Sequence, residues 1–82
     1  AKDGAGLRDW AQQRFAEARS YLERAVLLDP NHAEVRSNLG AAYAGLGLLP
    51  EAIAQFEAAL RIDPHDPGAL ENLKRVKAAL SP

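Results

Sequence analysis

The chain repeats its own pattern at an interval of 34 residues. Three dipeptides occur twice at this spacing: Glu17-Ala18 with Glu51-Ala52, Asp29-Pro30 with Asp63-Pro64, and Asn38-Leu39 with Asn72-Leu73. A fixed period of roughly 20 to 50 residues is typical of folds that stack one supersecondary unit upon the next. The repeat therefore predicts a layered stack of similar units rather than a single irregular core.

The periodic segments have the character of helices. Alanine and leucine, both strong helix formers, are abundant, and apolar residues recur at three- and four-residue steps between short clusters of Pro, Gly and Asp. The sequence predicts an all-α fold of about four helices, over residues 7–28, about 33–45, 50–62 and from 67 onward. Because the intervening loops are short, neighbouring helices are expected to form antiparallel hairpins.

Size, charge and cysteine content exclude several classes of protein. The chain has 82 residues, a formal net charge of -1 at pH 7 and no cysteine, so we expect one small domain over residues 1–82, without disulfides. A near-neutral charge offers no basic surface for phosphates, and no apolar run approaches the roughly 18 residues of a membrane span. We expect no nucleic-acid partner, no membrane segment and no signal peptide. A soluble protein follows, for which the cytoplasm is favoured, although the sequence does not identify the compartment.

The residues that could carry chemistry are scattered. None of the three serines has a base at a usable spacing, and the carboxylates alternate with Arg and Lys as on a solvated helix face. His32 and His65 both lie in turns. A metal site would pair one of them with a nearby aspartate, but exposed helix-start and turn residues explain the same pattern more simply. We expect no metal, no cofactor and no enzymatic activity.

Residues 33–66 resemble one complete tetratricopeptide repeat. Eight residues stand at the family's spacing: Leu39, Gly40, Tyr43, Gly47, Ala52, Phe56, Ala59 and Pro64. Small residues such as Gly40 and Ala52 let two antiparallel helices approach closely, while large ones such as Phe56 fill the space beside them. Arg36 departs from the pattern, because the family most often has Trp or another large apolar residue there.

The resemblance also divides the rest of the chain. Residues 7–30 are similar to the second helix of a preceding repeat, with an extension towards the N-terminus, so they form a half repeat without its first helix. Residues 67–82 are similar to the first helix of a following repeat. Lys74 and Lys77 stand where the family packs a small residue and an aromatic one. Since those lysines need water, we expect this segment to be a terminal capping helix.

Tetratricopeptide repeats bind protein partners, and the resemblance implies such a role here. In the family, the first helices of successive hairpins line a concave groove that holds peptides or partner helices. Nine residues would face this groove: Glu34, Ser37, Asn38, Ala41, Ala44, Glu71, Asn72, Arg75 and Ala78. The amides of Asn38 and Asn72 can hydrogen-bond a peptide backbone whatever its side chains. Alternatively, each amide bonds only within its own hairpin.

One family specialisation is not supported by the residues. Some members clamp the acidic C-terminal tails of heat-shock chaperones with Lys, Asn and Arg side chains on three first helices. Asn38 matches one residue of that clamp, but Gly68 and Asn72 stand where basic residues belong. The partner therefore remains a protein or peptide of unknown identity.

The first helix suggests an alternative role in self-association. In the family its apolar face would be covered by a helix that this chain lacks before residue 7. An exposed apolar face commonly marks an interface, so we expect a homodimer that pairs through this helix. The residues concerned are Leu7, Trp10, Phe15, Ala18, Leu22 and Ala25. Two other readings stay open: Leu7 and Trp10 fold back on the chain's own hairpin, or the chain is a piece of a longer array.

Overall fold

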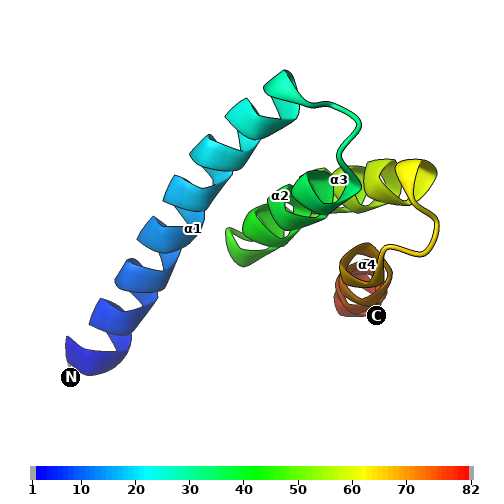
Figure 1. Ribbon diagram of the computed structural model, residues 1–82. Coiled ribbons are helices and arrows are strands. Elements are labelled where there is room, and N and C mark those ends of the chain that lie inside the picture. Colours follow the sequence, from blue (N-terminus) through cyan, green and yellow to red (C-terminus); the bar gives the residue numbers. More distant parts are fainter. Residues whose placement is uncertain (1, 82) are drawn as a thin grey trace.

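Within the part of the chain that it describes, the computed structural model is entirely helical. It describes the backbone of residues 2–81 and the side chains of residues 9–81. Those residues form four helices joined by short loops, α1 (Lys2–Leu28), α2 (Ala33–Gly45), α3 (Leu49–Ile62) and α4 (Pro67–Leu80), and no strand (Figure 1). The prediction of an all-α fold with about four helices is confirmed.

Local sequence signals account for most helix ends. The carboxylate of Asp66 accepts a hydrogen bond of 2.9 Å from the backbone N–H of Ala69 and so caps the start of α4. Nδ1 of His32 accepts one of 3.3 Å from the N–H of Val35 at the start of α2. Gly47, just after α2, has φ +79°, a conformation that glycine adopts without steric cost. These caps place the loops where the sequence predicts them.

The start of α1 differs from the prediction. The helix begins at Lys2 and not at Leu7. Its first turns contain Gly4 and Gly6, which interrupt the apolar pattern on which the expected start was based. A glycine inside a helix costs only about 1 kcal/mol relative to alanine, so two of them weaken the helix without ending it.

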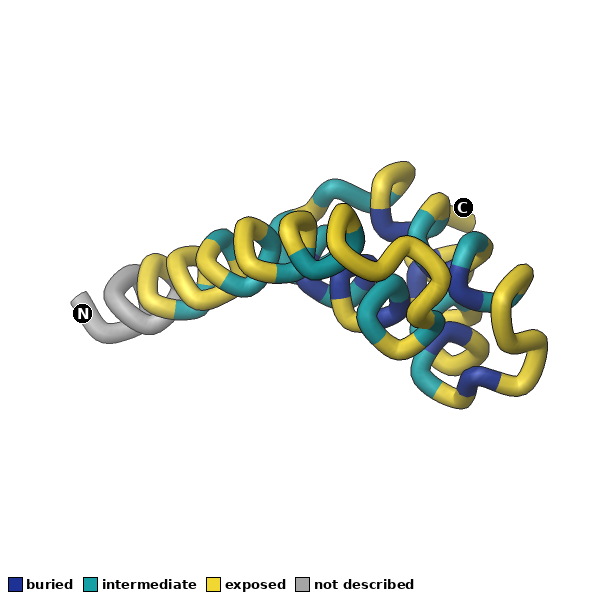
Figure 2. Tube along the Cα trace, turned by 45° about the horizontal axis from the view of Figure 1, so that its top comes forward, coloured by how far each residue is buried: buried dark blue, intermediate teal, exposed yellow. Residues whose placement is uncertain are grey.

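The core lies among α2, α3 and α4. Its central side chain is Phe56 on α3, which is fully buried. Around it lie small or medium apolar residues that are at most 6% exposed: Ala52, Ala59, Ala69 and Val76. Leu39 and Ala42 on α2 are also buried. Figure 2 shows the buried segments concentrated in these three helices. Because alanine dominates this core, the helices approach one another closely, as the repeat pattern requires.

The first helix is attached differently from the others. Among the described residues α1 packs against α2 alone, whereas α2 packs against both α3 and α4, and α3 against α4. In Figure 1 the blue N-terminal half of α1 extends beyond the hairpin of α2 and α3. One long side of α1 is consequently left without a helix against it in the described part of the chain.

Candidate functional site

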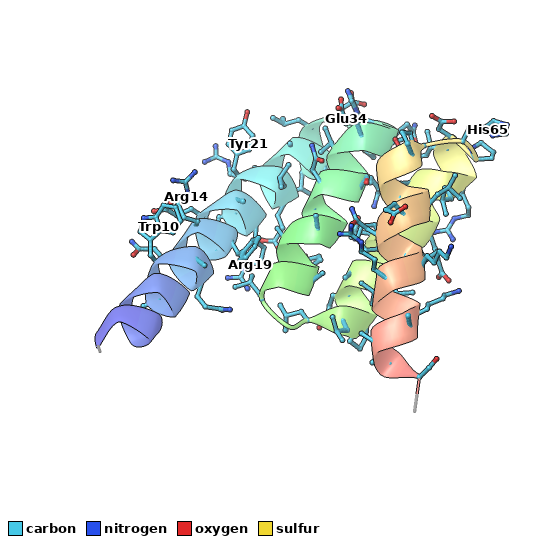
Figure 3. All side chains as sticks on the ribbon, turned by 90° about the horizontal axis from the view of Figure 1, so that it is seen from below. Trp10, Arg14, Arg19, Tyr21, Glu34 and His65 are labelled. Atoms are coloured by element: carbon cyan, nitrogen blue, oxygen red, sulfur yellow. The ribbon has the colours of Figure 1, made fainter. Side chains whose placement is uncertain are left out.

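The predicted peptide groove lies along α2 and α4, which pack side by side (Figure 3). Glu34 and Asn38 are exposed on α2, and Asn72 on α4 is half-buried. The remaining predicted residues are placed as follows: Ala41 and Ala44 are half-buried, and Glu71, Arg75 and Ala78 are exposed. On α4 the guanidinium Nε of Arg75 lies 3.5 Å from a carboxylate oxygen of Glu71. This face thus offers two amides and mixed charges to a partner.

Ser37 is not accessible on this face. It is 4% exposed, and its hydroxyl oxygen lies 2.9 Å from the place that a Cβ on Gly68 would take. The absence of a side chain at Gly68 lets the start of α4 approach α2, and that approach covers the serine. The accessible part of the predicted groove therefore excludes Ser37.

A hollow joins this face to the first helix. It has a volume of about 550 Å³ and lies along α1, where Asn38 of α2 borders it. Its lining combines one amide of the predicted groove with residues of the predicted self-association surface: Asn38 with Arg14, Glu17, Ala18, Tyr21 and Leu22. The two surfaces that the sequence predicts separately are therefore contiguous. The sequence carries a signal for this contact, because α1 and α2 are neighbouring helices of one stack, but the packing angle that opens the hollow is not visible in it.

The hollow continues along α1 in both directions. One end adjoins a hollow lined by Trp10, Gln13, Arg14 and Glu17. The other end adjoins a hollow of about 530 Å³, lined by Ser20, Tyr21, Arg24, Ala25 and Leu28. Arg14 and Glu17 line both the first and the second of these hollows, and Tyr21 lines the first and the third, so we call the three together the α1 groove. From residue 10 to residue 28 it is about 27 Å long at 1.5 Å per helical residue, which is enough for several turns of a second helix.

The exposed aromatic residues of α1 line this groove. Trp10 is 59% and Tyr21 73% exposed, and the guanidinium carbon of Arg14 lies 5.1 Å from the centre of the Trp10 ring. Such a distance allows a cation–π interaction that holds the indole against the helix surface. Figure 3 shows Trp10, Arg14 and Tyr21 on the side of α1 that faces away from α2. This side of α1 therefore presents large apolar surface to solvent.

The other predicted self-association residues are placed less uniformly. Ala18, Leu22 and Ala25 are half-buried and line the α1 groove. The side chain of Leu7 lies outside the described residues. Phe15 packs instead on the chain's own hairpin, since a Cβ on Gly45 would lie 2.6 Å from its ring. The alternative in which Leu7 and Trp10 fold back on the hairpin is not tested by this contact, and Trp10 is 59% exposed.

A hydrogen bond fixes α1 against α2. The hydroxyl of Tyr43 donates to a carboxylate oxygen of Glu23 across 2.6 Å. Partial burial, the hydrogen bond and the negative charge of Glu23 together raise the pKa of Tyr43 to about 12. The amide of Gln12 adds a second link, donating to the carbonyl oxygen of Gly45 across 3.2 Å. Neither contact follows from the repeat pattern, because both depend on how the two helices meet.

The described residues show no cluster suited to a metal. Among them, no three His, Asp or Glu side chains lie close enough together to share an ion. Nor does any helix within residues 2–81 combine the length and the apolar character that crossing a membrane demands.

Comparisons with known proteins agree with the geometry. The model of the tetratricopeptide repeat family matches residues 4–67. An Hsp70-Hsp90 organizing protein of Triticum aestivum is 38% identical over 66 residues, which are 80% of this chain and 11% of that protein. The tetratricopeptide repeat-containing protein trd-1 of Caenorhabditis elegans is 35% identical over 68 residues, 83% of this chain and 9% of its own length. An inactive TPR repeat-containing thioredoxin of Arabidopsis thaliana is 46% identical over 50 residues, 61% and 7% of the two lengths. The chain thus spans about a tenth of these relatives.

Proposed function

This chain belongs to the tetratricopeptide repeat family, and from that premise we propose that it is a non-catalytic module that binds a peptide or helix of a partner protein. The observation that carries the proposal is the hollow in which Asn38 meets Ala18 and Leu22. An amide there can bond a partner's backbone while the apolar residues beside it take up a side chain. A combination of a few polar groups with apolar walls is typical of binding sites.

The proposed path of the partner runs over both amides. A peptide that lies across α4 and α2 passes Asn72 and then Asn38, and from there it reaches the α1 groove. Glu34, Glu71 and Arg75 flank this path as exposed charges, and Ala41 leaves room for the peptide between the amides. The charges are of both signs, so they favour a partner of mixed charge over a strongly acidic or basic one.

The names of some relatives associate those proteins with Hsp70 and Hsp90. We do not extend a clamp for acidic chaperone tails to this chain. Gly68 and Asn72 stand where such a clamp has basic residues, and the start of α4 is packed against Ser37 at Gly68. The proposal is therefore limited to peptides whose recognition depends on the two amides and the α1 groove.

The test combines peptide selection with substitution of the amides. Peptides selected on the 82-residue chain from a random displayed library serve as probes, and their affinities are measured with the double variant Asn38→Ala, Asn72→Ala. At about 1 kcal/mol for each lost hydrogen bond, the affinity should fall roughly 30-fold. Asn31→Ala, in an exposed loop, is the matched control and should bind like the unmodified chain. A double variant that binds the peptides as tightly as the unmodified chain would contradict the proposal.

A second candidate function is self-association through α1. The observation that favours it is the exposure of Trp10 and Tyr21 beside Leu22 in the α1 groove, a face on which a second copy could lie. Light scattering should then give twice the mass of one chain, and the double variant Trp10→Ala, Tyr21→Ala should return the mass to that of the monomer. A monomeric mass of the unmodified, folded chain at micromolar concentration would rule this function out.

A further inference from the structure

The contact between α2 and α3 shows what a helix in this fold requires of its neighbour. Phe56 on α3 is fully buried, and its ring lies against Gly40 on α2 so closely that a Cβ there would come within 2.5 Å. Ala52 and Ala59, one turn on either side of Phe56, are also fully buried. Close approach in this hairpin therefore depends on a residue without a side chain opposite the central apolar one.

Within the described residues, the α1 groove is the same kind of face without a helix that covers it. Shifted by 34 residues, Ala52, Phe56 and Ala59 correspond to Ala18, Leu22 and Ala25. These three residues are only half-buried and line hollows. By this correspondence the groove fits a helix of the α2 type, with a small residue opposite Leu22.

The helix α4 is of that type. It packs on α3 as α2 packs on α1, because the pair Lys77–Glu57, with 3.9 Å between ammonium nitrogen and carboxylate oxygen, repeats the pair Tyr43–Glu23 one period later. Its outer side is open within the described chain, and Leu70 on that side is 49% exposed. Within the described chain, the α1 groove thus has no helix of the α2 type packed on it, and the outer side of α4 has no helix of the α1 type beside it.

One residue of α4 does not fit the α1 groove. Lys74 occupies the position of Gly40 in the 34-residue register and is exposed on α4. In an α4–α1 junction with the geometry of the contact between α2 and α3, its side chain would meet Leu22 of the second copy. Leu22 is smaller than Phe56 and leaves room opposite it for a small residue such as alanine, but not for a long side chain, and the ammonium group of Lys74 would lose water against an apolar neighbour.

We propose that α4 and the α1 groove are complementary halves of one repeat unit, and that Lys74 keeps copies of this chain from joining end to end through them. A junction between different surfaces of two copies is not closed by symmetry, so each added copy offers the same free end again. Lys74 thereby prevents open-ended assembly and leaves the α1 groove accessible to other partners. Specificity of this kind rests on a repulsive element in place of a new attraction.

The test removes the lysine and measures mass. Lys74→Ala should make the weight-average mass rise with concentration, by about twofold or more above that of the unmodified chain, whose single copy weighs 8.8 kDa. Arg75→Ala is the matched control, because it removes the same charge from the next residue of α4 and should leave the mass unchanged. Adding Leu22→Lys to Lys74→Ala should abolish the rise.

Two results would overturn the proposal. One is a Lys74→Ala chain that keeps its helical circular dichroism and has the mass of the unmodified chain at every concentration. The other is a rise in mass that Leu22→Lys leaves intact, since the junction would then not involve the α1 groove. A closed dimer through α1 stops at two copies, so continued growth distinguishes end-to-end joining from the self-association considered above.

Cysteine capture gives an independent measurement, because the chain contains no cysteine of its own. A chain with Lys74→Cys is mixed with a differently tagged chain with Leu22→Cys under oxidising conditions. The mixed disulfide should form several-fold faster than with Arg75→Cys in place of Lys74→Cys. Equal rates would contradict a contact between position 74 and Leu22 of a second copy.

Discussion

Gly40 lies against the ring of Phe56 so closely that no side chain fits between them, and a Cβ built on Gly40 would come 2.5 Å from Cε1 of the ring. The ring cannot move aside easily, because Phe56 is fully buried among alanines. This one contact sets the distance between α2 and α3 and, through it, the position of the predicted binding face. It also leads to a stability prediction.

Gly40→Ala should destabilise the fold. Alanine gains about 1 kcal/mol over glycine in a helix interior, but overpacking a core costs about 1–3 kcal/mol. The clash is severe, so we expect a net loss of about 1 kcal/mol in the free energy of unfolding, measured by urea denaturation. In a Phe56→Leu background the smaller side chain leaves room, and the same change should be neutral or stabilising. A loss of equal size in both backgrounds would contradict the steric explanation.

Alkaline pH should weaken the attachment of α1 through Tyr43. The pKa of Tyr43 is raised from 10.0 to about 12 in the folded chain, so folding favours the protonated phenol. This contribution to stability is fully present below pH 10 and is lost as the pH rises through 10 to 12. The difference in unfolding free energy between the unmodified chain and Tyr43→Phe should therefore shrink over that interval.

The matched variant for this experiment is Tyr21→Phe. Tyr21 is 73% exposed, and its removal leaves Tyr43 as the only tyrosine. Ultraviolet absorbance of tyrosinate in this variant should then titrate near pH 12. A midpoint near the ordinary value of 10.0 would show that the bond from Tyr43 to Glu23 does not persist in solution.

Asp66→Ala should cost about 1 kcal/mol of stability, because the carboxylate caps α4 through the N–H of Ala69 and is 8% exposed. Thermal or denaturant unfolding measures the loss, and the amide hydrogen of Ala69 should exchange faster with solvent. Asp66→Ser keeps an oxygen that can accept the bond, so it should retain most of the stability. If serine were no better than alanine, the capping bond would not be the cause.

Phe15→Ala should loosen the N-terminal half of α1. The ring lies on Gly45 but is 37% exposed, so the loss should be about 1 kcal/mol, well below the 3–5 kcal/mol or so of a fully buried phenylalanine. Hydrogen exchange should accelerate in α1 and remain unchanged in α3. Tyr21→Ala removes an aromatic residue that is mostly in solvent and should change stability by less than about 0.5 kcal/mol. Equal effects of the two variants would argue against the docking of Phe15.

The sequence predicted the last three helices well, because residues close to their ends determine where each helix begins or stops. Pro67 follows the capping residue Asp66, Gly47 takes the positive φ after α2, and Pro50 lies in the first turn of α3. These residues act within a few positions of themselves, so their effects can be inferred without knowing what packs where. The same holds for the small residues of the repeat, whose burial follows from the 34-residue period.

Features that depend on the angle between helices were not predictable in this way. Ser37 shares the spacing of the groove residues but is covered, because Gly68 admits the start of α4. Phe15 shares the spacing of the exposed stripe but reaches Gly45, which is 30 positions away. The meeting of Asn38 with Leu22 in one hollow likewise depends on how far α1 tilts from α2. Periodicity reports which side of a helix is apolar, and it does not report which neighbour that side meets.

Because α1 is attached to α2 alone within the described residues, we expect it to undock more readily than the other helices. Helices α2, α3 and α4 share one core, whereas α1 is held by its contact with α2 alone, which can open without breaking that core. A ligand can then shift the equilibrium between the docked and undocked states of α1. A partner that bridges Asn38 and the α1 groove binds only the docked state, so its affinity includes the free energy of docking. Substitutions at Tyr43 or Phe15, which lie outside the proposed binding path, would then change the affinity for the partner by changing how firmly α1 docks on α2.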